Sequence, residues 1–225
     1  MAPSKFKGAL FDLDGTLADN YSAIHLCTCE VFKRHGIPAP TRQRIVSTVG
    51  GSILITMKRL LAGTQFADKY EQVASEYLDI YDKFVFCDLR AMPYSGEILK
   101  ALKAAGIRLG CFTNKQEEAA EKVLERLGLR EHLDCVVATT LHSPRKPDPR
   151  YTQMALRALG VEASDAVCIG DSPFDYKAAD SCCVACALVS TGGDSRESLV
   201  ENCPRAIGVY DDLRALAKGV FSVEI

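Results

Sequence analysis

Short apolar runs that alternate with amphipathic stretches restrict the fold of this chain more than any other feature of its sequence. These runs, bounded by turn or capping residues, occupy residues 8–11, 107–112, 135–138, 166–169 and 184–189. Nearly continuous apolar runs of this length are typical of strands that are buried on both faces of a parallel sheet. Helical periodicity lies between them, at residues 96–105, 117–127, 151–159 and 176–180. The alternation therefore predicts an α/β fold with a doubly wound parallel sheet.

One long segment interrupts the alternation. Residues 17–88 contain no clear buried strand, and helical patterns occupy residues 21–34, 42–49, 53–61 and 69–82. The chain has 225 residues, which is long enough for a core with a smaller insert. We therefore expect a core formed by residues 1–16 and 89–225, and an inserted helical part formed by residues 17–88.

Composition and charge exclude several classes of protein. The 27 lysines and arginines are offset by 29 aspartates and glutamates, so the net charge is −2 and no nucleic-acid partner is expected. No apolar run reaches the roughly 18 residues that a membrane span needs. The N-terminus lacks a secretory pattern, so we expect a cytoplasmic protein. In that compartment the ten cysteines are expected to remain reduced, as small buried apolar side chains, although a redox or metal role stays open.

Polar side chains follow the first two apolar runs directly. Asp12 and Asp14 come after the first run, and Gly15 allows the chain to curl so that both carboxylates face one site. Thr113 and Asn114 come after the second run, and their hydroxyl and amide groups suit phosphate oxygens. Each group also has a purely structural interpretation. The first is an Asp-Gly turn that closes a strand, and the second is a helix N-cap.

Two further groups precede or follow later elements. Lys146 stands beside Pro147 in the sequence Arg-Lys-Pro-Asp-Pro, where the two prolines restrict the backbone and would hold the lysine in one direction. Asp171 and Asp175 follow the fourth apolar run. The structural alternatives are a solvated lysine beside a helix start and an N-cap role for Asp171.

These groups predict a cation site if their strands are neighbours, because ligands bind beyond the carboxyl ends of the strands of a parallel sheet. Two carboxylates about 4 Å apart repel each other by roughly 4 kcal/mol at an effective dielectric constant of 20. Several carboxylates therefore need a cation, and a hard divalent ion with oxygen ligands, most naturally Mg²⁺, resolves the repulsion.

At this point the sequence resembles the haloacid dehalogenase-like hydrolase superfamily, in particular its phosphoglycolate-phosphatase-like members. The resemblance covers nearly the whole chain, and it implies a Rossmann-like core with an inserted α-helical cap. It also implies an aspartyl-phosphate mechanism. The implied roles are nucleophile (Asp12), general acid and base (Asp14), phosphate binding (Thr113, Asn114, Lys146) and Mg²⁺ binding (Asp12, the Asp14 backbone carbonyl, Asp171, with Asp175 in support).

The resemblance implies an Mg²⁺-dependent phosphatase that acts on a small phosphorylated metabolite, with phosphoglycolate, pyrophosphate and nucleoside monophosphates as candidates. We expect a monomer or weak dimer. Two alternatives remain: a sugar-phosphate mutase of the β-phosphoglucomutase type, and a catalytically silent phosphate-binding protein on the same fold. Gly50 and Gly51 lie in the insert and are candidates for substrate specificity, although a simple interhelical turn also explains them.

Overall fold

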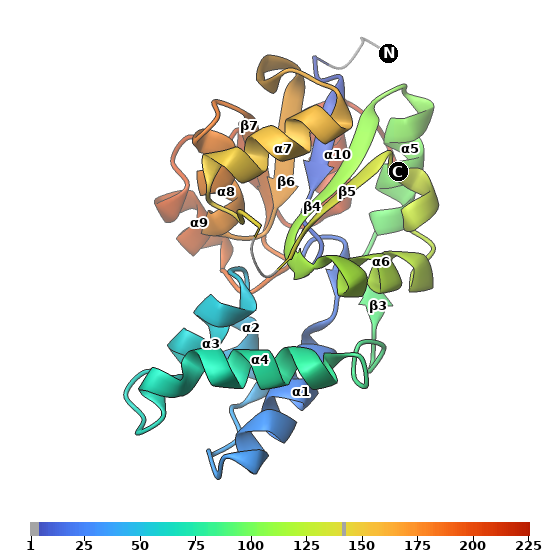
Figure 1. Ribbon diagram of the computed structural model, residues 1–225. Coiled ribbons are helices and arrows are strands. Elements are labelled where there is room, and N and C mark those ends of the chain that lie inside the picture. Colours follow the sequence, from blue (N-terminus) through green and yellow to red (C-terminus); the bar gives the residue numbers. More distant parts are fainter. Residues whose placement is uncertain (1–4, 141–142) are drawn as a thin grey trace.

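The computed structural model describes residues 5–140 and 143–225. Its centre is a sheet in which all neighbouring strands are parallel, in the order β5-β4-β1-β6-β7-β8 (Figure 1). These strands span Gly8–Phe11 (β1), Arg108–Gln116 (β4), Cys135–Thr139 (β5), Ala166–Gly170 (β6), Ala185–Val189 (β7) and Gly208–Tyr210 (β8). The predicted doubly wound parallel sheet is confirmed. Strand β8 was not predicted, because its three residues are only half buried and show no apolar run.

Helices cover both faces of this sheet. One face packs against α5 (Ser95–Ala104), α6 (Glu117–Arg126) and α10 (Leu213–Phe221), and the other packs against α7 (Pro149–Leu159), α8 (Pro173–Asp180) and α9 (Arg196–Asn202). Short 3-10 turns lie at Ala67–Lys69, Arg130–His132 and Ala163–Asp165. The strands are buried on both sides as a result, which explains why their sequences read as continuous apolar runs.

Residues 21–81 form a separate group of helices beyond one edge of the sheet (Figure 1). This helical group consists of α1 (Tyr21–Arg34), α2 (Arg42–Val46), α3 (Ile53–Leu61) and α4 (Tyr70–Tyr81). The segments that enter and leave this helical group pair as an antiparallel ribbon of β2 (Ala18–Asp19) and β3 (Arg90–Ala91). The expected helix at 42–49 is too long, because α2 ends at Val46 and residues 47–51 turn toward the sheet.

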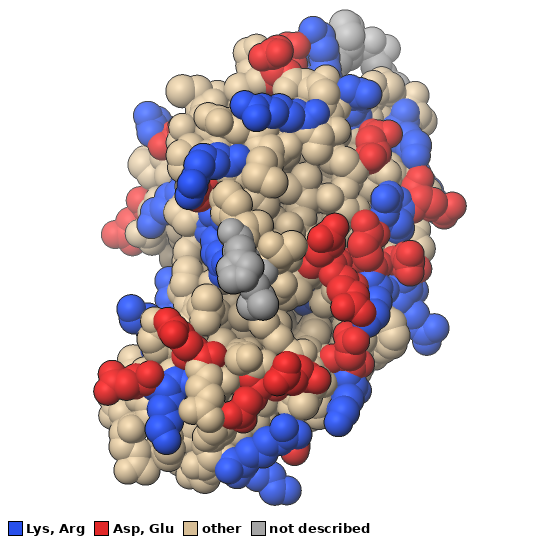
Figure 2. All heavy atoms as spheres, in the orientation of Figure 1, with Lys and Arg blue, Asp and Glu red and all other residues tan. Residues whose placement is uncertain are grey.

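The surface carries charged side chains of both signs. On the face shown in Figure 2, Lys and Arg side chains are spread over most of the surface, and Asp and Glu side chains gather over α6. Among the described residues, no helix combines the length and the apolar character that crossing a membrane requires. All ten cysteines are free thiols, and half of them are buried.

The sheet register brings the functional strand ends together. Phe11, the last residue of β1, lies beside Cys111 of β4 and beside Ile169 of β6. The residues that follow these three positions therefore emerge at one edge of the sheet. After Phe112 the pairing of β4 with β5 becomes irregular, so Thr113, Asn114 and Lys115 leave the regular ladder at this edge.

The Tyr151 hydroxyl of α7 hydrogen-bonds to the backbone at that irregular end of β4. It lies 2.6 Å from the Thr113 carbonyl oxygen and 3.1 Å from the Val137 carbonyl oxygen, and the residue is fully buried. We predict that Tyr151→Phe lowers the free energy of unfolding by about 1–2 kcal/mol, because two buried acceptors lose their donor. Urea denaturation measures this loss. Tyr70→Phe removes an exposed hydroxyl and should change stability by less than about 0.5 kcal/mol. Equal effects of the two substitutions would contradict the role of Tyr151.

Candidate active site

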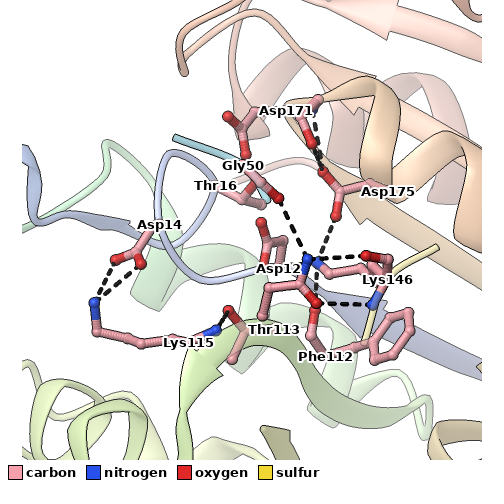
Figure 3. Close-up of polar contacts among 12 residues, drawn as sticks. Asp12, Asp14, Thr16, Gly50, Phe112, Thr113, Lys115, Lys146, Asp171 and Asp175 are labelled. Carbon is pink, nitrogen blue, oxygen red and sulfur yellow. Dashed lines mark hydrogen bonds and ion pairs between the residues drawn. The ribbon is translucent and has the colours of Figure 1, made fainter. Parts of the chain in front are cut away.

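A buried lysine shared by two aspartates lies at the centre of the site (Figure 3). The Lys146 Nζ atom lies 2.9 Å from Asp12 Oδ1 and 2.6 Å from Asp175 Oδ1. It also donates to the Phe112 carbonyl oxygen at 2.8 Å. Burial alone would lower the pKa of Lys146, but the two carboxylates outweigh burial and raise it, so the side chain stays charged.

Asn114 and the helix start of α7 fix the backbone of Lys146. The Lys146 N–H donates to Asn114 Oδ1 at 2.8 Å, and Asn114 Nδ2 donates to the Lys146 carbonyl oxygen at 3.2 Å. Asp148 caps α7 by accepting from the Arg150 N–H, and Pro149 occupies the first turn. Lys146 is 1% exposed, which excludes the interpretation as a solvated lysine. The Asn114 amide is thus engaged in holding the lysine, while it was expected to face phosphate.

Asp171 and Asp175 follow β6 and have different surroundings. Asp175 Oδ2 accepts from the N–H and from the hydroxyl of Ser172, and its other oxygen faces Lys146. Asp171 accepts from the Thr16 hydroxyl at 2.9 Å. The N-cap of α8 is Ser172, so the N-cap interpretation of Asp171 is wrong. The N-cap interpretation of Thr113 and Asn114 is also wrong, because α6 begins after Gln116.

The backbone passes unusually close to Asp171. A Cβ atom on Gly15 would lie 2.5 Å from Asp171 Oδ2, and one on Gly192 would lie 1.7 Å from the same oxygen. Gly15 also has a φ of +90°, which other residues rarely adopt. Gly15 therefore lets the chain curl and leaves room for the Asp171 carboxylate, but the Asp14 carboxylate, which was expected to face the same site as Asp12, contacts Lys115 instead.

The carboxylates outnumber the cation that faces them. Oxygens of Asp12, Asp171 and Asp175 lie within 4.8 Å of one another, and all three residues are buried. Asp12 Oδ1 accepts no hydrogen bond of ordinary geometry from the described residues, and its contact with Lys146 is an ion pair. Burial raises the pKa of Asp12 to about 6, against the opposing effect of Lys146. Burial, together with Asp175 and Asp12, raises the pKa of Asp171 well above its ordinary value.

This excess of negative charge fits a divalent cation. Carboxylate oxygens are the ligands that Mg²⁺ prefers, and a bound Mg²⁺ would offset the two carboxylates that Lys146 leaves uncompensated. Asp12 and Asp171 would hold such an ion, because both oxygens of Asp175 are already engaged.

The Asp14 carboxylate points away from this cluster (Figure 3). Its two oxygens lie 3.2 and 3.0 Å from Lys115 Nζ, and the same Nζ donates to the Tyr81 hydroxyl at 3.0 Å. Burial alone would lower the pKa of Lys115, but Asp14 and Tyr81 raise it. The sequence analysis missed Lys115 and Tyr81. Lys115 directly follows Thr113 and Asn114 at a strand end, which was an available signal, whereas Tyr81 lies in a helical pattern that gave none.

A cavity separates the strand ends from the helical group and encloses about 640 Å³ of empty space, counting the part that is open to solvent. Asp12, Asp14 and Thr113 line it from the sheet side. Gly50 and Gly51 line it from the loop between α2 and α3, and the Gly50 carbonyl oxygen lies 3.5 Å from Asn114 Nδ2. Both glycines expected to face substrate are thus at the cavity wall, although they also form an interhelical turn.

Comparison with known protein families gives a match over most of the chain. Residues 9–189 match the family model described as haloacid dehalogenase-like hydrolase. The chain is 32% identical to a phosphoglycolate phosphatase from Rhodospirillum rubrum, over 93% of this chain and 89% of that protein. It is 31% identical to an N-acetylmuramic acid 6-phosphate phosphatase from Pseudomonas aeruginosa, over 79% of this chain and 78% of that protein.

Solved structures share the fold. A hydrolase of the haloacid dehalogenase-like family from Streptococcus pneumoniae superposes with a TM-score of 0.83 at 21% identity, and the match covers 95% of this chain and 98% of that one. The order of the strands and the helices on both faces are therefore those of a known architecture.

We predict that Mg²⁺ raises the melting temperature, and that this effect is larger near pH 8 than near pH 5. The cation binds ionised carboxylates, and because the pKa values of Asp12 and Asp171 are raised, protons displace it as the pH falls through about 6. Thermal unfolding with and without Mg²⁺ measures the effect. Asp171→Asn should remove most of it, and Asp68→Asn, at an exposed position, should leave it intact. A pH-independent effect, or one that survives Asp171→Asn, would show that the cation binds elsewhere.

Proposed function

The chain belongs to the haloacid dehalogenase-like hydrolase family, and from this premise we propose that it is an Mg²⁺-dependent phosphatase that hydrolyses a small phosphomonoester through an aspartyl-phosphate on Asp12. The observation that carries the proposal is the buried group of Asp12, Asp171 and Lys146 beneath a cavity. Phosphoryl transfer depends on positioning and on neutralised charge, and this group offers both.

In the first step a carboxylate oxygen of Asp12 attacks the phosphorus atom, and the bond from phosphorus to the leaving oxygen breaks. Lys146 holds Asp12 in place through the 2.9 Å ion pair and lowers the repulsion between this carboxylate and the phosphoryl oxygens. Thr113 lines the same cavity, and its hydroxyl can donate to a phosphoryl oxygen. In the second step water attacks phosphorus, which releases phosphate and restores the Asp12 carboxylate.

The leaving oxygen needs a proton, and we assign this transfer to Asp14. In the second step the same carboxylate would accept a proton from water. Both Asp14 oxygens contact Lys115 in this structure, so the side chain has to rotate toward the cavity before it can act.

The proposed ligands of Mg²⁺ are Asp12, the Asp14 backbone carbonyl and Asp171. Asp175 supports them indirectly, because it accepts hydrogen bonds from Ser172 and pairs with Lys146. When bound, Mg²⁺ supplies positive charge that stabilises the phosphoryl group during transfer.

We also propose that residues 17–88 act as a cap domain over the core formed by residues 1–16 and 89–225. The β2–β3 ribbon, where the segments that enter and leave the helical group pair, is the natural position for a hinge. Closure over the cavity would exclude bulk water from the reaction. We expect the enzyme to work in the cytoplasm as a monomer or weak dimer.

We predict that Asp12→Asn lowers kcat for p-nitrophenyl phosphate by a factor of about 10³ or more, because an amide is a poor nucleophile. The substitution is nearly isosteric, so the protein should remain folded. Steady-state kinetics with Mg²⁺ measure the effect, and circular dichroism checks the fold. Asp68→Asn is the matched control and should retain activity. A folded Asp12→Asn protein with substantial turnover, purified free of other phosphatases, would remove Asp12 from the nucleophile role.

A further inference from the structure

The part of the cavity that faces the helical group is largely apolar. The side chains that line it there come from α1, the α2–α3 loop, α3 and α4, and they include Ile24, Val49, Ile53, Tyr77 and Leu78. Ala119 of α6 adds a further apolar contact from the core. In the proposed reaction this wall faces the part of the substrate that leaves with the oxygen, since the phosphoryl group lies at Asp12.

Among the described residues that line this cavity, Lys115 is the single lysine or arginine. Its ammonium group has three protons to donate, and it faces both oxygens of Asp14 and the hydroxyl of Tyr81. The group is therefore already neutralised and saturated. A carboxylate on the leaving group would meet the charge of Asp14, and none of the described residues that line the cavity offers it an unpaired cation.

Two arginines near the cavity do not belong to its lining. Arg59 stacks over the ring of Phe174, with its guanidinium carbon 5.2 Å from the ring centre, and donates to the Thr48 carbonyl oxygen. Arg145 lines a second, adjoining cavity, which it shares with Glu71.

The far side of the opening is acidic. A third cavity shares Leu78, Gln116 and Ala119 with this cavity and is lined by Asp82, Glu117 and Glu118. Lys122 bridges Asp82 and Glu118, so an excess of negative charge remains. Figure 2 shows acidic side chains gathered over α6 on this face. An anionic substituent that extended from the active site in this direction would be repelled.

We infer that the leaving group of the substrate is uncharged, apolar along one side and larger than two carbon atoms. This inference rests on the proposed phosphatase function and narrows it, and it departs from the expectation that phosphoglycolate is the substrate. Phosphoglycolate carries a carboxylate two carbons from the ester oxygen, and it has no apolar part that could contact the Ile53 and Leu78 side chains of the cavity wall. An apolar leaving group of four to six carbons would instead contact Ile24, Ile53 and Leu78.

Two pairs of substrates test the inference. The first pair is phosphoglycolate and its neutral amide, which differ in charge but hardly in size. We expect kcat/KM to be at least about tenfold higher for the amide. The second pair is butyl phosphate and ethyl phosphate, whose leaving oxygens are chemically alike. We expect kcat/KM to rise by roughly fourfold for each added methylene, which gives butyl phosphate an advantage of about an order of magnitude.

Three variants locate the effect. Leu78→Lys places an ammonium group at the cavity wall and should raise kcat/KM for phosphoglycolate relative to its amide by about tenfold or more. Gln72→Lys places the same group on the exposed surface of α4 and should leave this ratio unchanged. Arg145→Gln should also leave it unchanged, because Arg145 lies outside this cavity. Thermal unfolding confirms that each variant is folded.

The inference would be overturned, while the phosphatase function stands, if the enzyme hydrolysed phosphoglycolate as well as its amide. A selective loss of phosphoglycolate turnover in Arg145→Gln would overturn it as well. Equal responses of Leu78→Lys and Gln72→Lys would also overturn it, because the α4 wall would then not face the leaving group. Failure of the protein to hydrolyse p-nitrophenyl phosphate with Mg²⁺ would instead overturn the proposed function itself, and the inference with it.

Discussion

The ammonium group of Lys146 ties together parts of the chain that are far apart in sequence. It faces Asp12 after β1, the Phe112 carbonyl oxygen on β4 and Asp175 on α8, and all of these groups are buried. Removing one partner from such a group typically costs about 3–5 kcal/mol, because an uncompensated charge stays buried. The segment after β1, strand β4 and helix α8 are therefore held in one arrangement. The hydrogen bonds between Asn114 and the Lys146 backbone add a further connection.

The same lysine leaves the site short of positive charge. It balances one of the three carboxylates that converge there, and burial together with the neighbouring carboxylates raises the pKa values of Asp12 and Asp171. A divalent cation would offset the charge of these carboxylates, and it would also attract the negatively charged phosphoryl group. Toward the helical group the surroundings change from charged to apolar, and the Lys115–Asp14 pair is at the boundary between the two regions.

The sequence predicted the parts of this arrangement that depend on local pattern. Asp12 and Asp171 directly follow apolar runs that proved to be neighbouring strands, so their approach could be expected before any contact was known. The engagement of Asn114 with Lys146 and of Asp14 with Lys115 could not be foreseen, because each pair is set by packing between distant segments. For the same reason periodicity did not predict the end of α2 or the short edge strand β8.

The central claim is that phosphoryl transfer passes through Asp12, and the stereochemical course at phosphorus tests it most directly. The measurement uses a thiophosphate monoester made chiral at phosphorus by oxygen isotopes, hydrolysed in isotopically labelled water with Mg²⁺. Two successive in-line displacements, first by Asp12 and then by water, give net retention of configuration. Inversion would show that water attacks the substrate directly, and it would contradict an aspartyl-phosphate on Asp12.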